Sequence, residues 1–154
     1  MIPSGSETRL AALVSPQPSL VGRRIADRYE VEILLGRGGM GEVHLAWDRV
    51  LDRPVAMKTA RHGSAEGLHR EAVLQSRLEH PAVAPVYEFG RDGDLNFLAL
   101  RYVPGVPVLH WPDPLRAIER AARAVDSFHR AGVVHCDLKP AHILASDRGV
   151  FVID

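Results

Sequence analysis

The 154-residue sequence lacks several features that mark particular classes of protein. It has a single cysteine, so no internal disulfide can form and a reducing compartment is expected. Its 19 basic and 19 acidic residues give a formal net charge of zero, which argues against a nucleic-acid-binding surface or a polybasic membrane patch. No apolar run approaches the roughly 20 residues that a membrane-spanning helix needs. These absences leave a globular, cytoplasmic protein with no membrane segment as the expectation.

The first part of the chain is predicted to be a flexible leader, residues 1–26. It contains Pro3, Pro16, Pro18 and several serines, which do not favour a packed core. It also lacks the basic start and the long apolar stretch of a secretion signal. The sequence does not indicate what this leader does.

The pattern changes at Tyr29, where two strands joined by glycines are predicted. Alternating apolar positions indicate a half-buried strand: Tyr29, Val31, Ile33 and Leu35. The run 36–43 (GRGGMGEV) follows, and 43–47 (VHLAW) indicates a second strand, so the glycines lie in a hairpin rather than at the start of a helix. Backbone N–H groups of such a hairpin can close over phosphates because no Cβ intervenes, although a plain turn is the alternative.

Three more strands and one helix are predicted before residue 103. Residues 54–58 form a strand that ends in Lys58, and residues 68–78 form a helix that stops before His80-Pro81. The runs 82–90 and 95–102 read as two strands joined by a turn at 91–94. The sequence therefore predicts a five-stranded antiparallel sheet with one helix.

The rest of the chain is predicted to hold one long helix and two short strands. Four prolines between residues 104 and 114 exclude a regular helix there. Residues 115–131 give the strongest helical pattern, which ends at Gly132. Its apolar face is predicted to consist of Ile118, Ala122, Val125 and either Phe128 or His129. Residues 143–145 and 150–153 read as the two short strands.

Between the long helix and these strands lies a polar loop with chemically useful residues, predicted to connect two strands. Asp137 and Lys139 are two residues apart, so they can face the same reacting group. The carboxylate can accept a proton from an attacking hydroxyl, and the ammonium can stabilise a phosphoryl group in transfer. Cys136 is expected to be a small buried residue rather than a redox-sensitive thiol.

Three stretches together resemble the protein kinase family. The loop 135–142 (HCDLKPAH) resembles H-R-D-L-K-P-x-N, the glycine hairpin resembles G-x-G-x-x-G-x-V, and residues 55–58 (VAMK) resemble V-A-I-K. The loop departs from the family at Cys136, where arginine is usual, and at His142, where asparagine is usual. The hairpin with Met40 and the run from His80 to Gly90 most resemble bacterial serine/threonine protein kinases.

The resemblance implies an α+β, protein-kinase-like fold and a set of site residues. Asp137 would orient the substrate hydroxyl and accept its proton, Lys139 would contact the γ-phosphate, Lys58 would contact the α- and β-phosphates, and Glu71 would pair with Lys58. Leu100 would be the gatekeeper behind the adenine. The residues implied to bind ATP are Leu35, Gly36, Gly38, Gly41, Val43, Ala56, Lys58, Leu100, Arg101, Val103 and Leu144.

The implied metal ligands are Asp154 and, with a change of chemistry, His142. Asp154 matches the aspartate of the D-F-G motif, and His142 stands where the family has an asparagine. Mg²⁺ prefers oxygen ligands, whereas imidazole suits softer metals. The hypothesis that follows is that Mn²⁺ supports nucleotide binding better than Mg²⁺.

By this resemblance the chain divides into a leader (1–26), a small lobe with the hinge (27–103), and an incomplete large lobe (104–154) that stops at the D-F-G aspartate. The implied function is transfer of the ATP γ-phosphate to serine or threonine hydroxyls of a protein substrate. The first alternative is a truncated pseudokinase that binds a nucleotide or a partner. An incomplete gene product and a small-molecule kinase are further alternatives. Lys58, Glu71, Asp137 and Asp154 favour the enzyme, whereas His142 and the short large lobe favour the first alternative.

Overall fold

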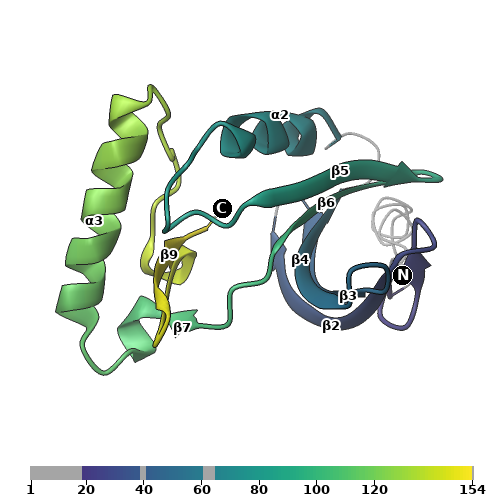
Figure 1. Ribbon diagram of the computed structural model, residues 1–154, viewed down its shortest axis with the longest axis horizontal. Helices are drawn as coiled ribbons and strands as arrows, with labels where there is room; N and C mark the ends of the chain where they lie inside the picture. The colour runs from purple at the N-terminus through teal and green to yellow at the C-terminus, as the bar shows by residue number, and fades with distance from the viewer. Residues whose placement is uncertain (1–18, 39–40, 61–64, 154) are drawn as a thin grey trace, which may run out of the picture.

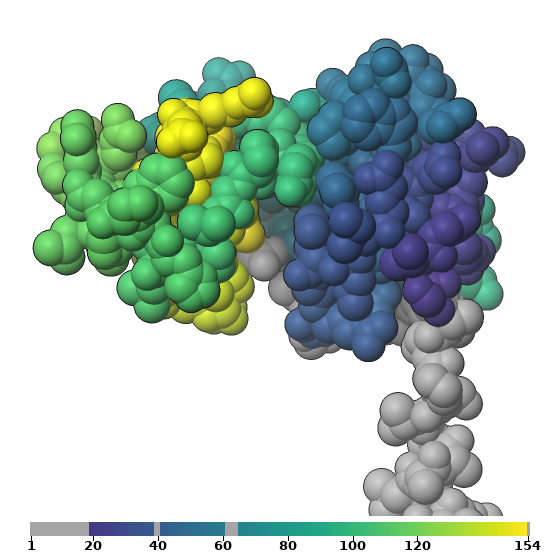
Figure 2. Space-filling view, turned by 90° about the horizontal axis from the view of Figure 1, so that it is seen from below, coloured from purple at the N-terminus to yellow at the C-terminus, as the bar shows by residue number. Residues whose placement is uncertain are grey.

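The structure, a computed structural model, describes residues 19–38, 41–60 and 65–153. Asp154 and most of the predicted leader therefore lie outside the described residues. The described chain forms two parts, a curled sheet with one helix and a smaller part built around a long helix (Figure 1). The space-filling view shows these two parts side by side, the purple and blue sheet beside the green and yellow C-terminal part (Figure 2). None of the described helices is long and apolar enough to cross a membrane.

The first part is an antiparallel sheet of six strands in the order β1-β2-β3-β4-β6-β5. The strands are β1 (Arg24–Ile25), β2 (Tyr29–Gly38), β3 (Gly41–Asp48), β4 (Arg53–Ala60), β5 (Val86–Asp92) and β6 (Leu95–Arg101). The five long strands are those that the sequence predicts, and the two-residue β1 extends the edge. The prediction of a flexible leader up to residue 26 is wrong for its described part, because Ile25 of β1 and Leu20 are buried in the core of the sheet. Neighbouring strands along the chain are joined mostly by tight turns, so the sheet is built largely from local pairings.

The concave face of this sheet holds the main apolar core. Buried side chains from five strands meet there, among them Tyr29, Val31, Ala46, Val55, Met57 and Phe97. The alternation predicted for the first strand holds only for its first half, because Ile33 and Leu35 are 55% and 48% exposed. The pairing of β2 with β3 shifts between Val31 and Ile33 and again between Leu34 and Gly36. These bulges turn the end of the strand away from the core and toward the glycine hairpin.

A polar cluster joins the edge strand β5 to the start of β2 and the end of β3. Arg28 donates from Nε and Nη2 to the two carboxylate oxygens of Asp48, at 2.8 and 2.7 Å, and from Nη1 to Glu88 at 3.0 Å. The Tyr29 hydroxyl donates to the same Glu88 oxygen at 2.6 Å. Asp48 is fully buried, and its pKa falls to about 2 chiefly because of the Arg28 hydrogen bonds. The cluster therefore ties β2, β3 and β5 together.

The helix α2 (Ala65–Ser76) packs on the sheet beside β5 and β6 (Figure 1). Leu68 and Ala72 are four residues apart and are buried against Ala60, Leu98 and Leu100. The helix begins three residues before the predicted Leu68 and ends two before the predicted Leu78. Residues 65–67, which include Gly67, extend the helix beyond its predicted start, because packing of the helix on the sheet outweighs the low helix propensity of one glycine.

The second part combines α3 (Pro114–Arg130) with three short antiparallel strands in the order β7-β8-β9. These are β7 (Val106–Pro107), β8 (Ile143–Ser146) and β9 (Gly149–Val152). The proline-rich stretch contributes only β7 and a 3₁₀ turn, Val108–His110, in line with the exclusion of a regular helix. The prediction that the polar loop 135–142 connects two strands is wrong at its start, because residues 133–134 form no strand and the loop follows α3 through irregular chain.

The ends of α3 follow from its sequence. The Asp113 side chain accepts a hydrogen bond from the Arg116 N–H at 3.2 Å, and Pro114 occupies the first helical position. At the other end Gly132 has φ +76°, and Val133 N–H donates to the Phe128 carbonyl at 2.9 Å.

The predicted apolar face of α3 is confirmed at Phe128 and is wrong by one residue at its other three positions. The buried residues are Ala117, Ala121, Ala124 and Phe128. Ile118 is 39% exposed and Ala122 is exposed, while Val125 is only partly buried. The small alanines bring the helix close to Ile143, Ala145 and Val152 of the short sheet. That close approach rotates the larger Ile118 away from the interface.

The chain between α2 and β5 packs on the second part rather than on the sheet alone. Ala82 and Val83 are buried in the same cluster as Phe128, and Ala84 packs with Val103 and Phe151. The Ala82 carbonyl also accepts a hydrogen bond from Val152 N–H at 2.9 Å. Two separate stretches of chain, 77–85 and 102–105, therefore run between the parts.

Candidate active site

The glycine hairpin is formed by the paired ends of β2 and β3, with Gly38 opposite Gly41. Gly41 has φ +140°, a conformation that L side chains rarely adopt, and a Cβ at this position would overlap the carbonyl oxygen of Thr59. The requirement for glycine at this position is therefore both conformational and steric. Gly39 and Met40 lie outside the described residues.

Lys58 and Glu71 form an ion pair between β4 and α2. Their Nζ and Oε1 atoms are 2.5 Å apart, and the side chains are only 13% and 19% exposed. Lys58 lies on β4 opposite Val43 of β3 and Leu98 of β6, and Glu71 faces it from one turn after Leu68. Low exposure makes this pair stronger than a surface pair, and it fixes the position of the Lys58 ammonium.

Asp137 and Lys139 lie together on the irregular loop that follows α3. Lys139 Nζ donates to Asp137 Oδ2 at 3.0 Å, and both side chains are exposed. The pKa of Asp137 lies below its ordinary value, mainly because of this hydrogen bond, with the positive charge of Lys139 adding to it. The carboxylate is therefore ionised at neutral pH.

Two histidines brace the same loop from within. His142 Nδ1 lies 2.9 Å from the Asp137 carbonyl oxygen, and because a carbonyl only accepts, this nitrogen carries a hydrogen and donates it. His135 Nε2 likewise donates to the Ile153 carbonyl at 3.1 Å, and the two rings stack with centroids 6.1 Å apart. Ile153 N–H in turn donates to the His142 carbonyl at 2.9 Å. The loop is thus closed against the chain that follows β9.

The expectation that Cys136 is buried is wrong. The residue is exposed, with a left-handed backbone conformation of φ +65°. The backbone needs this conformation to direct His135 inward and Asp137 outward, which leaves the intervening side chain in solvent.

A cavity of about 480 Å³ lies between the hairpin, α2 and the loop. Nine residues that the sequence singles out line it: Gly36, Gly38, Gly41, Val43, Lys58, Glu71, Asp137, Lys139 and His142. The sequence contains only two lysines, and both are in this set. The other lining residues are Arg37, Glu42, Thr59, Leu68, His135 and Cys136. These were not predicted for the site, although most of them are immediate neighbours of predicted residues.

Of the residues expected around an adenine ring, Val43 lines this cavity and the others do not. Leu100 is buried and Ala56 partly buried in the cluster under α2, and they are paired across β4 and β6. Val103 is buried and Leu144 partly buried beside Phe151, where the Arg101 guanidinium lies 5.3 Å from the ring centroid. Leu35 is half exposed on the bulged end of β2. The structure therefore brings together the residues expected at the phosphates and at the reacting hydroxyl, with the expected adenine residues packed nearby.

A metal site is not assembled among the described residues. They contain no group of three histidine, cysteine, aspartate or glutamate side chains that could hold a metal ion. Asp154 lies outside them, and His142 Nδ1 is committed to the Asp137 carbonyl. The imidazole does not offer the oxygen ligand that Mg²⁺ prefers.

Comparison with known proteins gives matches along most of the chain. The family model described as protein kinase domain matches residues 29–154. The serine/threonine-protein kinase PrkC of Bacillus subtilis is 34% identical over 145 residues, which cover 84% of this chain and 22% of PrkC. The serine/threonine-protein kinase PknB of Mycobacterium tuberculosis is 39% identical over 141 residues, covering 79% of this chain and 22% of PknB. The chain thus spans about a fifth of the length of these relatives.

Solved structures give the same picture for the fold. A crystal structure of the PknI kinase domain from Mycobacterium tuberculosis matches with a TM-score of 0.71 and 25% identity, over 90% of this chain and 62% of the other. The apo form of PpkA-294 matches with a TM-score of 0.74 over 91% of this chain and 62% of the other. At 19% identity, the second match concerns the fold alone.

Proposed function

Since this chain belongs to the protein kinase domain family and is homologous to bacterial serine/threonine kinases, we propose that it binds ATP and transfers the γ-phosphate to serine or threonine hydroxyls of proteins. One observation carries the proposal. The Lys58–Glu71 pair and the Asp137–Lys139 pair line one cavity, although they lie more than 60 residues apart in the sequence. The expected cytoplasmic location belongs to the same proposal, because ATP is available there.

The glycine hairpin and Lys58 would hold the phosphates of ATP. The hairpin supplies backbone N–H groups beside Gly41, a position where the Thr59 carbonyl oxygen leaves no room for a Cβ. Lys58 supplies a compact positive charge whose direction is set by Glu71. When bound, ATP supplies the phosphoryl group for transfer.

Asp137 and Lys139 would act on the incoming hydroxyl and on the developing charge. The ionised Asp137 carboxylate is 66% exposed, so a substrate hydroxyl can reach it and donate its proton. Lys139 is placed to turn its ammonium from Asp137 toward a phosphoryl oxygen, which costs little at an exposed site. We assign no step to a metal ion, because the described residues do not fit one.

A second candidate function is nucleotide binding without phosphoryl transfer. The observation that favours it is His142, whose ring replaces the family asparagine and is bonded to the backbone of Asp137. Nothing in that arrangement alters Lys58, Glu71 or the glycine hairpin. Binding of ATP and transfer of its phosphate therefore have to be measured separately.

Thermal unfolding of the 154-residue chain tests the nucleotide site first. A ligand at 100 times its dissociation constant stabilises a folded protein by about 2.7 kcal/mol, so ATP is expected to raise the unfolding temperature by several degrees. Lys58→Ala is expected to abolish the rise. Arg123→Ala, on the outer face of α3, is the matched control and is expected to keep it. An unchanged unfolding temperature of the natural sequence with ATP would contradict the proposal.

Phosphoryl transfer is then measured with radiolabelled ATP and a protein mixture rich in serine and threonine. The natural sequence is expected to incorporate label on serine or threonine, and Asp137→Asn to lose at least about a hundredfold of that activity. Asp137→Asn should retain the ATP-dependent rise in unfolding temperature. A rise with ATP but no transfer by the natural sequence would identify the second candidate function.

A further inference from the structure

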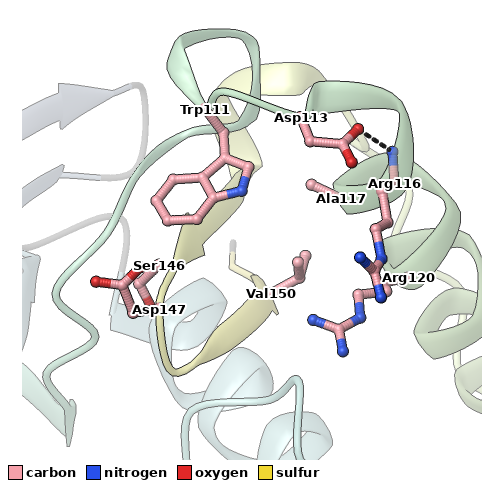
Figure 3. A pocket seen from close by; sticks show the side chains of 8 residues that line it. All are labelled: Trp111, Asp113, Arg116, Ala117, Arg120, Ser146, Asp147 and Val150. Carbon is pink, nitrogen blue, oxygen red and sulfur yellow. Dashed lines mark hydrogen bonds between the residues drawn. The ribbon is translucent and has the colours of Figure 1, made fainter.

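A second cavity, of about 310 Å³, lies at the N-terminal end of α3 and shares no residue with the first. It is bounded by the 3₁₀ turn, the first two turns of α3 and the turn between β8 and β9 (Figure 3). Its lining residues are Trp111, Asp113, Arg116, Ala117, Arg120, Ser146, Asp147 and Val150. Neither the family motifs nor the proposed reaction uses any of them.

Two arginines of α3 extend toward this cavity. Arg116 and Arg120 are four residues apart, so they project from the same side of the helix, and Figure 3 shows both guanidinium groups turned to the same side of the cavity. Elsewhere on α3 the arginines are neutralised, since Arg123 pairs with Glu119 at 2.6 Å and Arg130 with Asp126 at 2.7 Å. Within the described part of the chain, no carboxylate lies within 4 Å of either guanidinium of the Arg116–Arg120 pair.

The nearby carboxylates have other roles or directions. The Asp113 side chain caps the helix by accepting the Arg116 backbone N–H at 3.2 Å. Asp147 is exposed on the β8–β9 turn, across the cavity from the arginines (Figure 3). Two like charges at this spacing repel each other, so an added anion would stabilise the pair.

Trp111 supplies a third donor and an aromatic surface. The residue is partly buried against the apolar cluster of α3, and its indole N–H has no acceptor among the residues that the structure describes. The other tryptophan, Trp47, donates its indole N–H to Asp52 at 3.1 Å. Ala117 and Val150 are the aliphatic residues of the same lining.

We propose that this cavity binds the phosphate monoester of a phosphorylated serine or threonine in a protein segment. Two guanidinium groups and an indole N–H match the three terminal oxygens of such a group. Asp147 on the facing wall disfavours a longer polyanion such as a nucleoside triphosphate, and it can accept backbone N–H groups of the segment that carries the phosphate. The choice of phosphoserine or phosphothreonine rests on the proposed function, which would make these groups.

Binding is tested on the full chain, without nucleotide, with three labelled peptides. They are Ala-Ala-phosphoSer-Ala-Ala, the same peptide with serine, and the same peptide with glutamate. The phosphorylated peptide is expected to bind at least about tenfold more tightly than the other two, because charge-assisted bonds to a dianion are the stronger ones. The double variant Arg116→Gln, Arg120→Gln is expected to lose this preference. Arg123→Gln, on the same helix but outside the cavity, is expected to keep it.

A nuclear magnetic resonance titration locates the site. The chain has two tryptophans, so its spectrum has two indole N–H signals. The Trp111 signal is expected to shift with the phosphorylated peptide, while that of Trp47, held by Asp52, stays in place. Equal affinity for the three peptides, a preference that survives in the double variant, or a shift of Trp47 alone would overturn the proposal. Inorganic phosphate that binds as tightly as the phosphorylated peptide would overturn its assignment to a protein segment. Because no ATP is present, failure here would leave phosphoryl transfer unaffected.

Discussion

At the scale of single residues, the glycine hairpin depends most on Gly41. Replacement by alanine puts a side chain on a backbone with φ +140° and against the Thr59 carbonyl. We expect Gly41→Ala to lower the free energy of unfolding by about 1–3 kcal/mol, because β3 must move away from β4. Chemical denaturation measures this directly.

Gly36 provides the comparison for this prediction. It lies on the same hairpin, but a Cβ there would meet nothing within 4 Å. Alanine at position 36 is therefore expected to leave the unfolding free energy unchanged or to raise it slightly. If the two variants were equally stable, the close approach of Gly41 to β4 would not constrain the hairpin.

The second expectation at this scale concerns the metal ion that accompanies ATP, because His142 stands where the family has an asparagine. If ATP binds with a divalent cation, the imidazole at position 142 is expected to make Mn²⁺ more effective than Mg²⁺ in raising the unfolding temperature with ATP. His142→Asn is expected to reverse that order, because an amide oxygen suits Mg²⁺. Equal effects of the two ions on the natural sequence, or a larger effect of Mg²⁺, would contradict this expectation.

The motif residues could be predicted from the sequence, but the remaining lining residues could not. Lys58, Glu71 and Asp137 stand in short patterns whose chemistry is readable without coordinates. Thr59 and Glu42 line the cavity because β3 and β4 pair in a particular register. The exposure of Cys136 depends on its left-handed backbone conformation, and the sequence does not predict that conformation because residues other than glycine seldom adopt it.

At the scale of elements, α3 gives the sharpest test of packing. Phe128 of α3 is buried in the cluster between the helix and the short sheet, whereas Ile118 of the same helix is 39% exposed. We expect Phe128→Ala to destabilise the protein by about 3–5 kcal/mol through loss of buried surface and the cavity left behind. Ile118→Ala is expected to cost less than about 1 kcal/mol. Similar losses in the two variants would support the face predicted from the sequence instead.

The elements themselves were largely predictable, and the errors have physical causes. Alternating apolar residues and glycine or proline breaks located the five long strands and α3. The face of α3 was wrong because a helical pattern with alanines at 117, 121 and 124 fits two adjacent faces, and only the partner strands decide between them. The predicted start of α2 lies three residues too late, because the packing of the helix on the sheet through Leu68 is not visible in the sequence.

At the scale of the whole molecule, the buried Asp48 makes stability depend on pH. Its pKa falls from an ordinary value of 3.8 to about 2 in the folded protein. A depressed carboxyl pKa contributes stability that is fully present above pH 4 and is lost as the pH falls through about 2. A difference of this size corresponds to about 2 kcal/mol. Urea unfolding between pH 6 and pH 2 measures the loss.

Asp48→Asn serves as the reference for this prediction. The variant is expected to be less stable at pH 6 because Arg28 loses the buried one of its two carboxylate partners, and its stability should vary less with pH between 4 and 2. Equal pH dependence in both proteins would show that other carboxyl groups control the acid transition. The cluster could not be predicted, since Arg28, Asp48 and Glu88 become neighbours only when the sheet curls.

The placement of both lysines in one cavity has a practical consequence for covalent chemistry. Of the 19 lysine and arginine residues, only Lys58 and Lys139 are lysines. Apart from the terminal α-amine, these two side chains are therefore the primary amines of the protein. An acylating reagent, which reacts with amines and spares guanidinium groups, is therefore expected to modify the two lysines of this cavity and, apart from them, the terminal α-amine. Lys139 is half exposed and Lys58 is 13% exposed, so the two amines should acquire the acyl group in that order.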